Sequence, residues 1–277
     1  MPELPEVQTM ADDLKKKIVG RKIVKVWLDW ERHIKYPTPK KFKRDIIGAK
    51  IVNVSRRAKN VLMDLDKGNL LAIHPRMTGK FLVEHSTKSI RKHVHLILYL
   101  NGGLVLTFSD VRKFGKVLFG KKEEILNLPY FRNLGPDPFD KDLSFTKFKE
   151  IISIRKKKIK NVLMDQQALA GIGNIYADEI LWSAKVHPEK PANSLTNLEL
   201  KNIFNYMRLI LRRAIVLRGT SVSDYRDTSN RPGGFAPRLM VYGKEGVPCK
   251  RCRTTIKRIK LNGRSAHYCP KCQRLPK

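Results

Sequence analysis

The chain has 277 residues and a mass of 32.0 kDa, long enough for one large domain or two ordinary ones, and length alone favours two. Its 57 Lys and Arg residues against 25 Asp and Glu residues give a net charge of +32, which favours a polyanion such as nucleic acid as the partner. No uninterrupted apolar stretch approaches the ~20 residues of a membrane-spanning helix, and the start lacks the features of a secretory signal. Composition leaves open an anionic membrane surface or a ribosomal-type basic protein.

A helix is predicted to begin almost at the amino terminus. Pro5 stands where a first helical turn accepts proline, and apolar residues recur at helical spacing at Val7, Met10 or Ala11, Leu14 and Ile18. A packed helix holds its first residues in place, so Pro2 and Glu3 are expected to be fixed where most chain ends fray.

Pro2 carries a possible nucleophile, because removal of Met1 leaves a secondary α-amine at the chain start. An α-amine has a pKa of about 7.7 to 8.0 and a lysine about 10.4, so the terminus holds more than about a hundredfold more free base at pH 7. Its attack on a sugar C1′ gives an iminium that draws electrons during elimination of the 3′ phosphate. Glu3 is placed to shuttle protons and Glu6 to orient the site. The alternative is that Pro-Glu is an ordinary start.

From Val24 to Phe119 the sequence favours short β-strands. Val24, Val26, Leu28 and Trp30 alternate with polar residues, and turn signals such as Asn101-Gly-Gly103 separate the runs. We expect an antiparallel sandwich or barrel.

A domain boundary is predicted at Asn133 to Pro138, where two prolines and a glycine stop both periodicities. Helices are expected beyond it, and Thr196 and Glu199 form a capping box for the last one. The predicted helical ranges are 145–152, 159–169, 175–184 and 198–217.

A glycine-rich segment, Ala170-Gly-Ile-Gly-Asn-Ile-Tyr-Ala177, lies between two of these helices. Asn174 is expected to cap the following helix, whose free N–H groups then suit a phosphate. A plain helix-helix turn is the alternative.

The cysteines all lie near the carboxyl end, and their two CxxC pairs have the spacing of a closed four-thiolate zinc site: Cys249, Cys252, Cys269 and Cys272. We therefore expect one structural Zn²⁺ and a cytoplasmic location, with redox thiols as the alternative. Strands over 254–261 and 265–268, joined at Asn262-Gly263, would place Arg264 at the tip of a basic ribbon suited to phosphates. The alternative is a solvated basic surface.

In combination these segments resemble the formamidopyrimidine-DNA glycosylase family. The resemblance covers almost the whole chain and rests on PELPEV at 2–7, RRAK at 56–59, DVRKFG at 110–115, DQQALAGIGNIYADE at 165–179 and the four-cysteine segment ending in CPKCQ. It implies an α+β multidomain protein with DNA in the cleft between its halves. The expected parts are a catalytic β-sandwich domain (1–134), a linker (135–144), a helix-two-turn-helix domain (145–238) and a zinc finger (239–277).

The resemblance also implies roles for single residues. Pro2 would be the Schiff-base nucleophile, Glu3 the proton shuttle, Glu6 a supporting residue and Lys59 a phosphate contact at the catalytic site. Met77, Arg112 and Phe114 would fill the gap left by an extruded base; the full set of expected DNA-binding residues is His74, Met77, Arg112, Phe114, Lys160, Asn174 and Arg264.

Two segments limit what the resemblance carries over. Pro75-Arg76 stands just before Met77 where the family usually has small or apolar residues, and residues 221–235 resemble a variable loop that closes over the flipped purine. The expected activity is excision of 8-oxoguanine and formamidopyrimidines from duplex DNA, followed by β,δ-elimination, by a monomer with no membrane partner. The alternatives are an endonuclease VIII-type enzyme for oxidised pyrimidines and a non-catalytic DNA-binding zinc protein.

Overall fold

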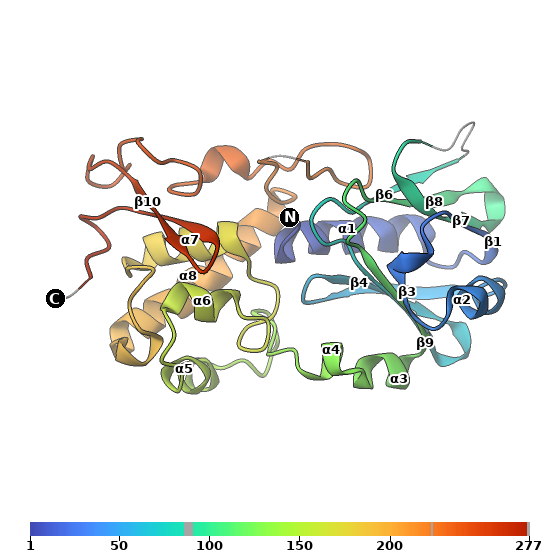
Figure 1. Ribbon diagram of the computed structural model, residues 1–277, viewed down its shortest axis with the longest axis horizontal. Helices are drawn as coiled ribbons and strands as arrows, with labels where there is room; N and C mark the ends of the chain where they lie inside the picture. The colour runs from blue at the N-terminus through green and yellow to red at the C-terminus, as the bar shows by residue number, and fades with distance from the viewer. Residues whose placement is uncertain (86–90, 223, 276–277) are drawn as a thin grey trace. The chain divides into compact units, whose positions relative to one another are not determined.

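The computed structural model describes residues 1–85, 91–222 and 224–275, and it divides into two compact units (Figure 1). The first unit comprises Met1–Asn133 together with Ile215–Ala236, and the second comprises Leu134–Ala214 together with Pro237–Lys277. This grouping differs from the consecutive parts expected from the sequence, because residues 215–236 pack with the amino-terminal unit and the zinc-finger segment packs with the helices.

Helix α1 (Leu4–Ile18) opens the first unit, as the apolar spacing predicted. Glu3 is its N-cap, and a capping box joins Glu3 and Glu6 reciprocally, which satisfies backbone N–H groups at the helix start. Val7, Leu14 and Ile18 on its inner face are fully buried. The helix therefore has a fixed first turn.

The first unit contains a four-stranded and a five-stranded sheet, which confirms the predicted β-sandwich. The four-stranded sheet has the order β1 (Ile23–Leu28), β7 (Val94–Leu100), β8 (Val105–Ser109), β6 (Lys80–Glu84). The five-stranded sheet has the order β2 (Ile34–Tyr36), β9 (Lys116–Lys121), β5 (Asn69–His74), β4 (Asn60–Leu65), β3 (Ile51–Arg57), and only β2 and β9 pair in parallel. One hydrophobic core joins α1 and both sheets.

Three short helices of this unit were not predicted: α2 (Pro39–Asp45), α3 (Lys122–Asn127) and α4 (Pro129–Arg132). Strand β1 also departs from the expected alternation, since Val24 is exposed and Ile23 is buried. A register shift between Ile23 and Lys25 explains the difference, because a bulge turns the side chains before and after it toward different faces.

The second unit contains α5 (Phe145–Ser153), α6 (Ile159–Met164), α7 (Asn174–Ala184), α8 (Asn197–Val216) and a hairpin of β10 (Lys257–Leu261) and β11 (Arg264–Tyr268). Helix α6 ends earlier than predicted because the N–H groups of Ala168 and Leu169 donate to the Asp165 carbonyl and close a separate turn. The Thr196–Glu199 capping box is present, with both of its hydrogen bonds formed. Within the described ranges, no helix is both long enough and apolar enough to cross a bilayer.

Candidate active site and nucleic-acid interface

The amino end of α1 holds Pro2 and Glu3 below the surface. Pro2 is buried, the exposed fraction of Glu3 is 2%, and Met1 beside them is exposed. The Glu3 N–H donates to Glu6 Oε2 at 2.7 Å. The chain start is thus fixed to the first helical turn, as the sequence predicted, and loss of Met1 would expose a nitrogen whose neighbours are already in place.

The second carboxylate oxygen of Glu6 reaches a loop that follows α8. The Thr220 N–H donates to Glu6 Oε1 at 2.7 Å. Gly219, the residue before Thr220, has a φ of +84°, which favours glycine. A Cβ at this position would lie only 2.8 Å from Glu6 Oε1, so any other residue would displace the Glu6 side chain. Glu6 therefore connects the chain start to a segment 214 residues further along the sequence.

Lys59 lies in the tight turn between β3 and β4. Ala58 takes a φ of +54° in this turn, and Lys59 itself is only 6% exposed. Arg56 ties the turn to α1, because its Nε donates to Gln8 Oε1 at 2.8 Å and its Nη1 to the Ala58 carbonyl at 2.9 Å. The RRAK segment is thereby anchored on the helix that carries Pro2 and Glu3.

His74 ends β5 and is almost fully buried. Its Nδ1 accepts the Arg76 N–H at 2.9 Å, so the proton of the neutral ring lies on Nε2. Burial, followed by the positive charges of Arg76, Lys59 and Lys116, lowers the pKa of His74 to about 3. His74 is a neutral imidazole at pH 7.

This low pKa predicts a pH dependence of folding. The folded pKa lies below the unfolded value of about 6.5, so the unfolded chain takes up a proton first and stability falls as pH drops from 6.5 toward 3. Because of His74, the free energy of unfolding should be about 2 kcal/mol lower at pH 5 than at pH 7. A His74→Asn variant, whose Oδ1 can still accept the Arg76 N–H, should lack this component in urea unfolding at both pH values. Equal pH dependence in the two proteins would contradict it.

Two neighbouring turns carry the residues expected to replace an extruded base. Met77 lies in the turn that the Gly79 N–H closes on the Pro75 carbonyl at 2.9 Å. Phe114 is 52% exposed, and the Arg112 guanidinium lies 4.9 Å from the centre of its ring. The Arg112 N–H donates to Thr78 Oγ1 at 3.1 Å, which brings the two turns side by side.

Asp110 organises both turns, a role that the sequence analysis did not predict although the residue begins the DVRKFG motif. It is fully buried; Oδ1 accepts from the Thr78 hydroxyl and the Arg112 N–H, and Oδ2 accepts the Gly115 N–H at 2.7 Å. The sequence does contain a signal for this role, because an aspartate at the start of a turn often accepts hydrogen bonds from the backbone N–H groups of the residues that follow.

In the second unit, the glycine-rich segment forms a braced turn before α7. The Gly171 N–H donates to Gln166 Oε1 at 2.8 Å, and Gln166 Nε2 donates to the Met164 and Ile172 carbonyls. The N-cap of α7 is Gly173, and Asn174 is the first helical residue rather than the predicted cap. Asn174 Oδ1 is buried and accepts no hydrogen bond from the described residues, so this oxygen can accept one from an incoming donor.

Lys160 departs most from the expectation. Its side chain is fully buried, and its ammonium pairs with Asp178 Oδ1 at 2.6 Å and donates to the Ser265 carbonyl at 2.5 Å. Asp178 Oδ2 in turn accepts the His267 N–H at 2.9 Å. Lys160 as placed here fastens the β10–β11 hairpin to α6 and α7 and presents no ammonium to solvent.

Arg264 begins β11 and is exposed beside the tight turn. Asn262 and Gly263 both have positive φ values, 46° and 75°, which confirms the predicted type of hairpin turn. Arg264 borders a surface hollow of about 270 Å³ together with Lys157, Asn161, Met164, Asp165, Leu261 and Asn262. The hairpin thus carries its arginine at the turn, as the sequence predicted.

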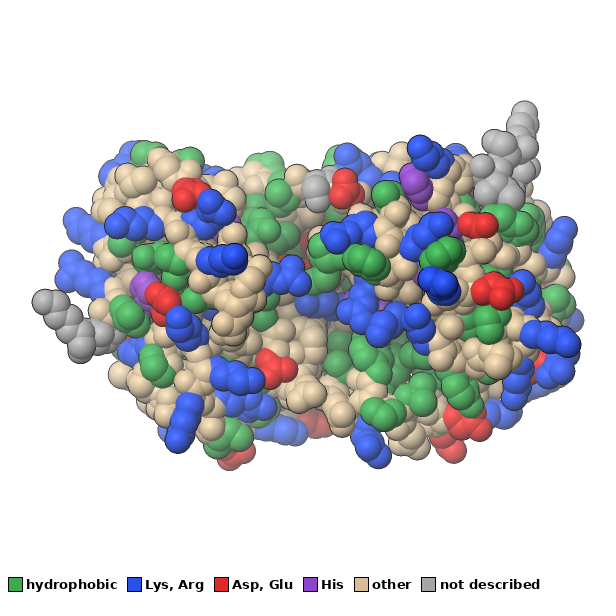
Figure 2. Space-filling model, viewed as in Figure 1, with side chains coloured by type: hydrophobic (Ala, Val, Ile, Leu, Met, Phe, Trp, Pro, Cys, Tyr) green, Lys and Arg blue, Asp and Glu red, His purple; other side chains and the backbone are tan. Residues whose placement is uncertain are grey.

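Lys and Arg side chains are plentiful on the face seen in Figure 2, in keeping with the net charge of +32.

The four cysteine Sγ atoms converge within 4.8 Å of one another. The Cys252–Cys269 and Cys252–Cys272 separations are 3.4 and 3.3 Å, far longer than a disulfide and near the roughly 3.8 Å edge of a tetrahedral zinc–thiolate site. Trp182 Nε1 lies 3.4 Å from Cys249 Sγ, in position to donate to it. The residues present therefore fit one structural zinc, held by the two predicted knuckles.

Comparison with known proteins finds matches that together span almost the whole chain. Three family models match: the formamidopyrimidine-DNA glycosylase N-terminal domain over residues 1–117, its H2TH domain over 134–226, and the zinc finger found in FPG and IleRS over 246–275. Formamidopyrimidine-DNA glycosylase of Herpetosiphon aurantiacus is 40% identical over 274 residues, which is 99% of this chain and 100% of the relative. The chain belongs to the formamidopyrimidine-DNA glycosylase family.

Solved structures of this glycosylase family agree. A mutant of Lactococcus lactis FPG in complex with Fapy-dG-containing DNA has a TM-score of 0.92 and 37% identity, covering 99% of this chain and 100% of that one. The Lactococcus lactis Fpg complex with DNA containing an abasic site also has a TM-score of 0.92, at 36% identity with the same coverage. The glycosylase fold expected from the sequence is thereby confirmed.

Proposed function

We propose that this protein is a base-excision DNA glycosylase that removes 8-oxoguanine and formamidopyrimidines from duplex DNA and then cleaves the strand by β,δ-elimination. The observation that carries the proposal is the buried, hydrogen-bonded chain start, Pro2-Glu3, in a member of the formamidopyrimidine-DNA glycosylase family. The DNA contents named for the Lactococcus lactis complexes, Fapy-dG and an abasic site, support the same substrate class.

Pro2 acts as the nucleophile after loss of Met1. Its nitrogen lone pair bonds to C1′ while the C1′–base bond breaks, and the base leaves with the electron pair and a proton. Opening of the sugar ring then gives an iminium that keeps its positive charge without a proton. Loss of a C2′ proton expels the 3′ phosphate, and a further elimination expels the 5′ phosphate.

Glu3 supplies the proton transfer that these steps need. It follows Pro2 directly, and its backbone is fixed by Glu6, so its carboxylate moves little relative to the nucleophile. A carboxyl group so placed can protonate the deoxyribose oxygen as the ring opens. Glu6 orients the chain start, and Lys59 holds a phosphate at the catalytic site.

Met77, Arg112 and Phe114 fill the space left when the damaged nucleotide turns out. Unstacking a base costs a few kcal/mol, and an apolar wedge with an arginine facing the orphaned base offsets that cost. Exposure of Phe114 and its stacking on Arg112 support this role, because an aromatic ring left half in water suits insertion between bases.

Asn174, through its N–H groups, and Arg264 hold phosphates beside the lesion, while Lys160 positions the hairpin that carries Arg264. His74 contributes at the same interface as a neutral hydrogen-bond donor. We assign residues 1–134 as the catalytic part, 135–144 as a linker, 145–238 as the helical DNA-binding part and 239–277 as the zinc finger, and within the third part residues 215–236 pack with the catalytic part. The enzyme acts as a cytoplasmic monomer on DNA.

The test is product release from labelled duplexes that contain either 8-oxoguanine or thymine glycol. We expect faster release of 8-oxoguanine, with a strand break carrying phosphates on both sides. Preference for thymine glycol would favour the endonuclease VIII alternative. Tight binding without base release from either duplex would favour a non-catalytic DNA-binding protein.

A further inference from the structure

A long loop leaves the end of α8 and returns to its own starting point. Its two limbs form a short ladder: the Gly234 N–H donates to the Leu217 carbonyl at 2.7 Å and the Phe235 N–H to the Gly219 carbonyl at 3.0 Å. Between the limbs, Ser221 Oγ accepts the Gly233 N–H at 2.9 Å. Ser223 lies outside the described residues.

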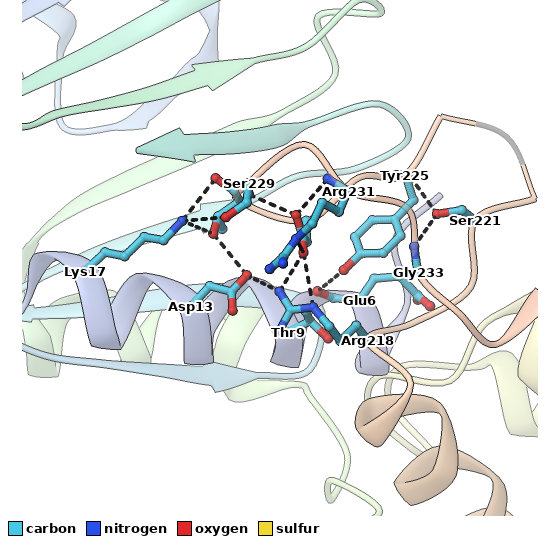
Figure 3. Close-up of polar contacts among 12 residues, drawn as sticks. Glu6, Thr9, Asp13, Lys17, Arg218, Ser221, Tyr225, Ser229, Arg231 and Gly233 are labelled. Atoms are coloured by element: carbon cyan, nitrogen blue, oxygen red, sulfur yellow. Dashed lines mark hydrogen bonds and ion pairs between the residues drawn. The ribbon is translucent and has the colours of Figure 1, made fainter. Parts of the chain in front are cut away.

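Arg218, at the start of this loop, bonds two aspartates from different parts of the chain (Figure 3). Its Nη2 lies 2.6 Å from Asp13 Oδ2 on α1 and 2.7 Å from Asp227 Oδ2 on the returning limb, and its Nε lies 3.1 Å from the same Asp227 oxygen. The Asp227 side chain is 1% exposed and that of Asp13 is 11% exposed. The guanidinium therefore joins α1 to both limbs.

Asp227 shapes the returning limb at the same time. Its Oδ1 accepts the N–H groups of Ser229 and Arg231, both at 2.9 Å, and closes a tight turn. The Thr228 hydroxyl donates to Asp13 Oδ2 at 3.0 Å, and Lys17 Nζ donates to Ser229 Oγ at 2.9 Å. The turn is thus fastened along α1 (Figure 3).

We propose that Arg218, with Asp13 and Asp227, is a positioning residue that clamps this loop on α1 and so holds the chain start through Glu6. Two residues after Arg218, the Thr220 N–H donates to Glu6 Oε1, and the other Glu6 oxygen accepts the Glu3 N–H beside Pro2. The clamp lies two turns along α1 from that contact. The inference rests on the proposed function of Pro2.

The chemistry of the clamp favours arginine. A planar guanidinium presents several N–H donors in a fixed geometry, whereas a lysine ammonium offers one point charge. Although burial works against the charged form, the Arg231 N–H and the Arg218 guanidinium hold the pKa of Asp227 below its ordinary value. The two aspartates in turn raise the pKa of the Arg218 guanidinium, so Arg218 and Asp227 are both charged at neutral pH and their contact persists where the enzyme would act.

The experiment compares Arg218→Met, Arg218→Lys and Asp13→Asn with the unaltered enzyme on DNA containing an abasic site. A small displacement of a reacting group costs up to about 100-fold in rate, so we expect kcat and the rate of borohydride trapping to fall between about tenfold and 100-fold for Arg218→Met. KM should change by less than about threefold, and the other two variants should be intermediate. Arg44→Met, which removes an exposed Arg–Asp pair, is the matched control and should keep full activity.

Full kcat in Arg218→Met, or a loss confined to KM, would overturn the clamp. Amide hydrogen exchange separates this result from a failure of the proposed function. The Thr220 amide should exchange at least about tenfold faster in Arg218→Met and in Asp13→Asn than in the unaltered protein, whether or not abasic DNA is cleaved. Unchanged exchange in both variants overturns the clamp, whereas faster exchange in an enzyme that does not cleave the DNA overturns only the proposed role of Pro2.

Discussion

A Pro2→Gly variant is expected to release 8-oxoguanine at least about 100-fold more slowly than the unaltered enzyme, with little change in DNA affinity. Glycine keeps an α-amine, but this amine is primary, so the imine it forms is neutral and needs a proton before it can draw electrons. It also removes the ring that fixes the backbone ahead of Glu3. Single-turnover kinetics with a labelled duplex measure the effect.

The matched control is Pro39→Gly, which makes the same substitution at the first residue of α2, where the nitrogen lies inside the chain. This variant should excise the base at the normal rate. Full activity in Pro2→Gly, with covalent trapping transferred to Lys59, would show that the nucleophile is assigned to the wrong residue.

Removal of the metal should abolish the phosphate contacts of the carboxy-terminal hairpin. A structural zinc contributes on the order of 10 kcal/mol to the local fold, so a Cys249→Ser variant should lose the ordered ribbon while the β-sandwich core remains. Loss of the Arg264 contact alone should weaken DNA binding by roughly 10- to 100-fold, corresponding to about 1.5 to 3 kcal/mol for a charged hydrogen bond. Fluorescence anisotropy on abasic DNA measures the affinity.

Thr255→Ser is the control for this variant, since Thr255 is exposed and belongs to neither CxxC pair. It should bind one zinc per chain and keep full affinity. Unchanged DNA affinity in a Cys249→Ser protein shown by metal analysis to be free of zinc would contradict the role given to the ribbon.

Features set by local chemistry were predictable from the sequence. The helix from Leu4, the Thr196–Glu199 capping box and the turn at Asn262-Gly263 each depend on a few adjacent residues, and all are present. The four-cysteine cluster was equally predictable, because CxxC spacing alone brings two ligands together. For Pro2, the position at the chain start and its chemistry were enough to suggest a role.

Features that depend on distant partners were not predictable. The sequence alone does not show that Lys160 is buried, because its partners Asp178 and Ser265 come from distant parts of the chain. Arg218 and Asp13 lie 205 residues apart in the sequence, and no local sequence pattern predicts that they pair. Asp110 belongs to the DVRKFG motif, yet its contact with Thr78 forms only when two turns meet.

In the proposed mechanism the nitrogen of Pro2 bonds to the sugar of the damaged nucleotide. Borohydride reduction during turnover, followed by proteolysis and mass spectrometry of the crosslinked peptide, tests it most directly. We expect the sugar adduct on the amino-terminal nitrogen of a peptide that begins with Pro2 and lacks Met1. An adduct on Lys59, or a fully active enzyme that still carries Met1, would contradict the account.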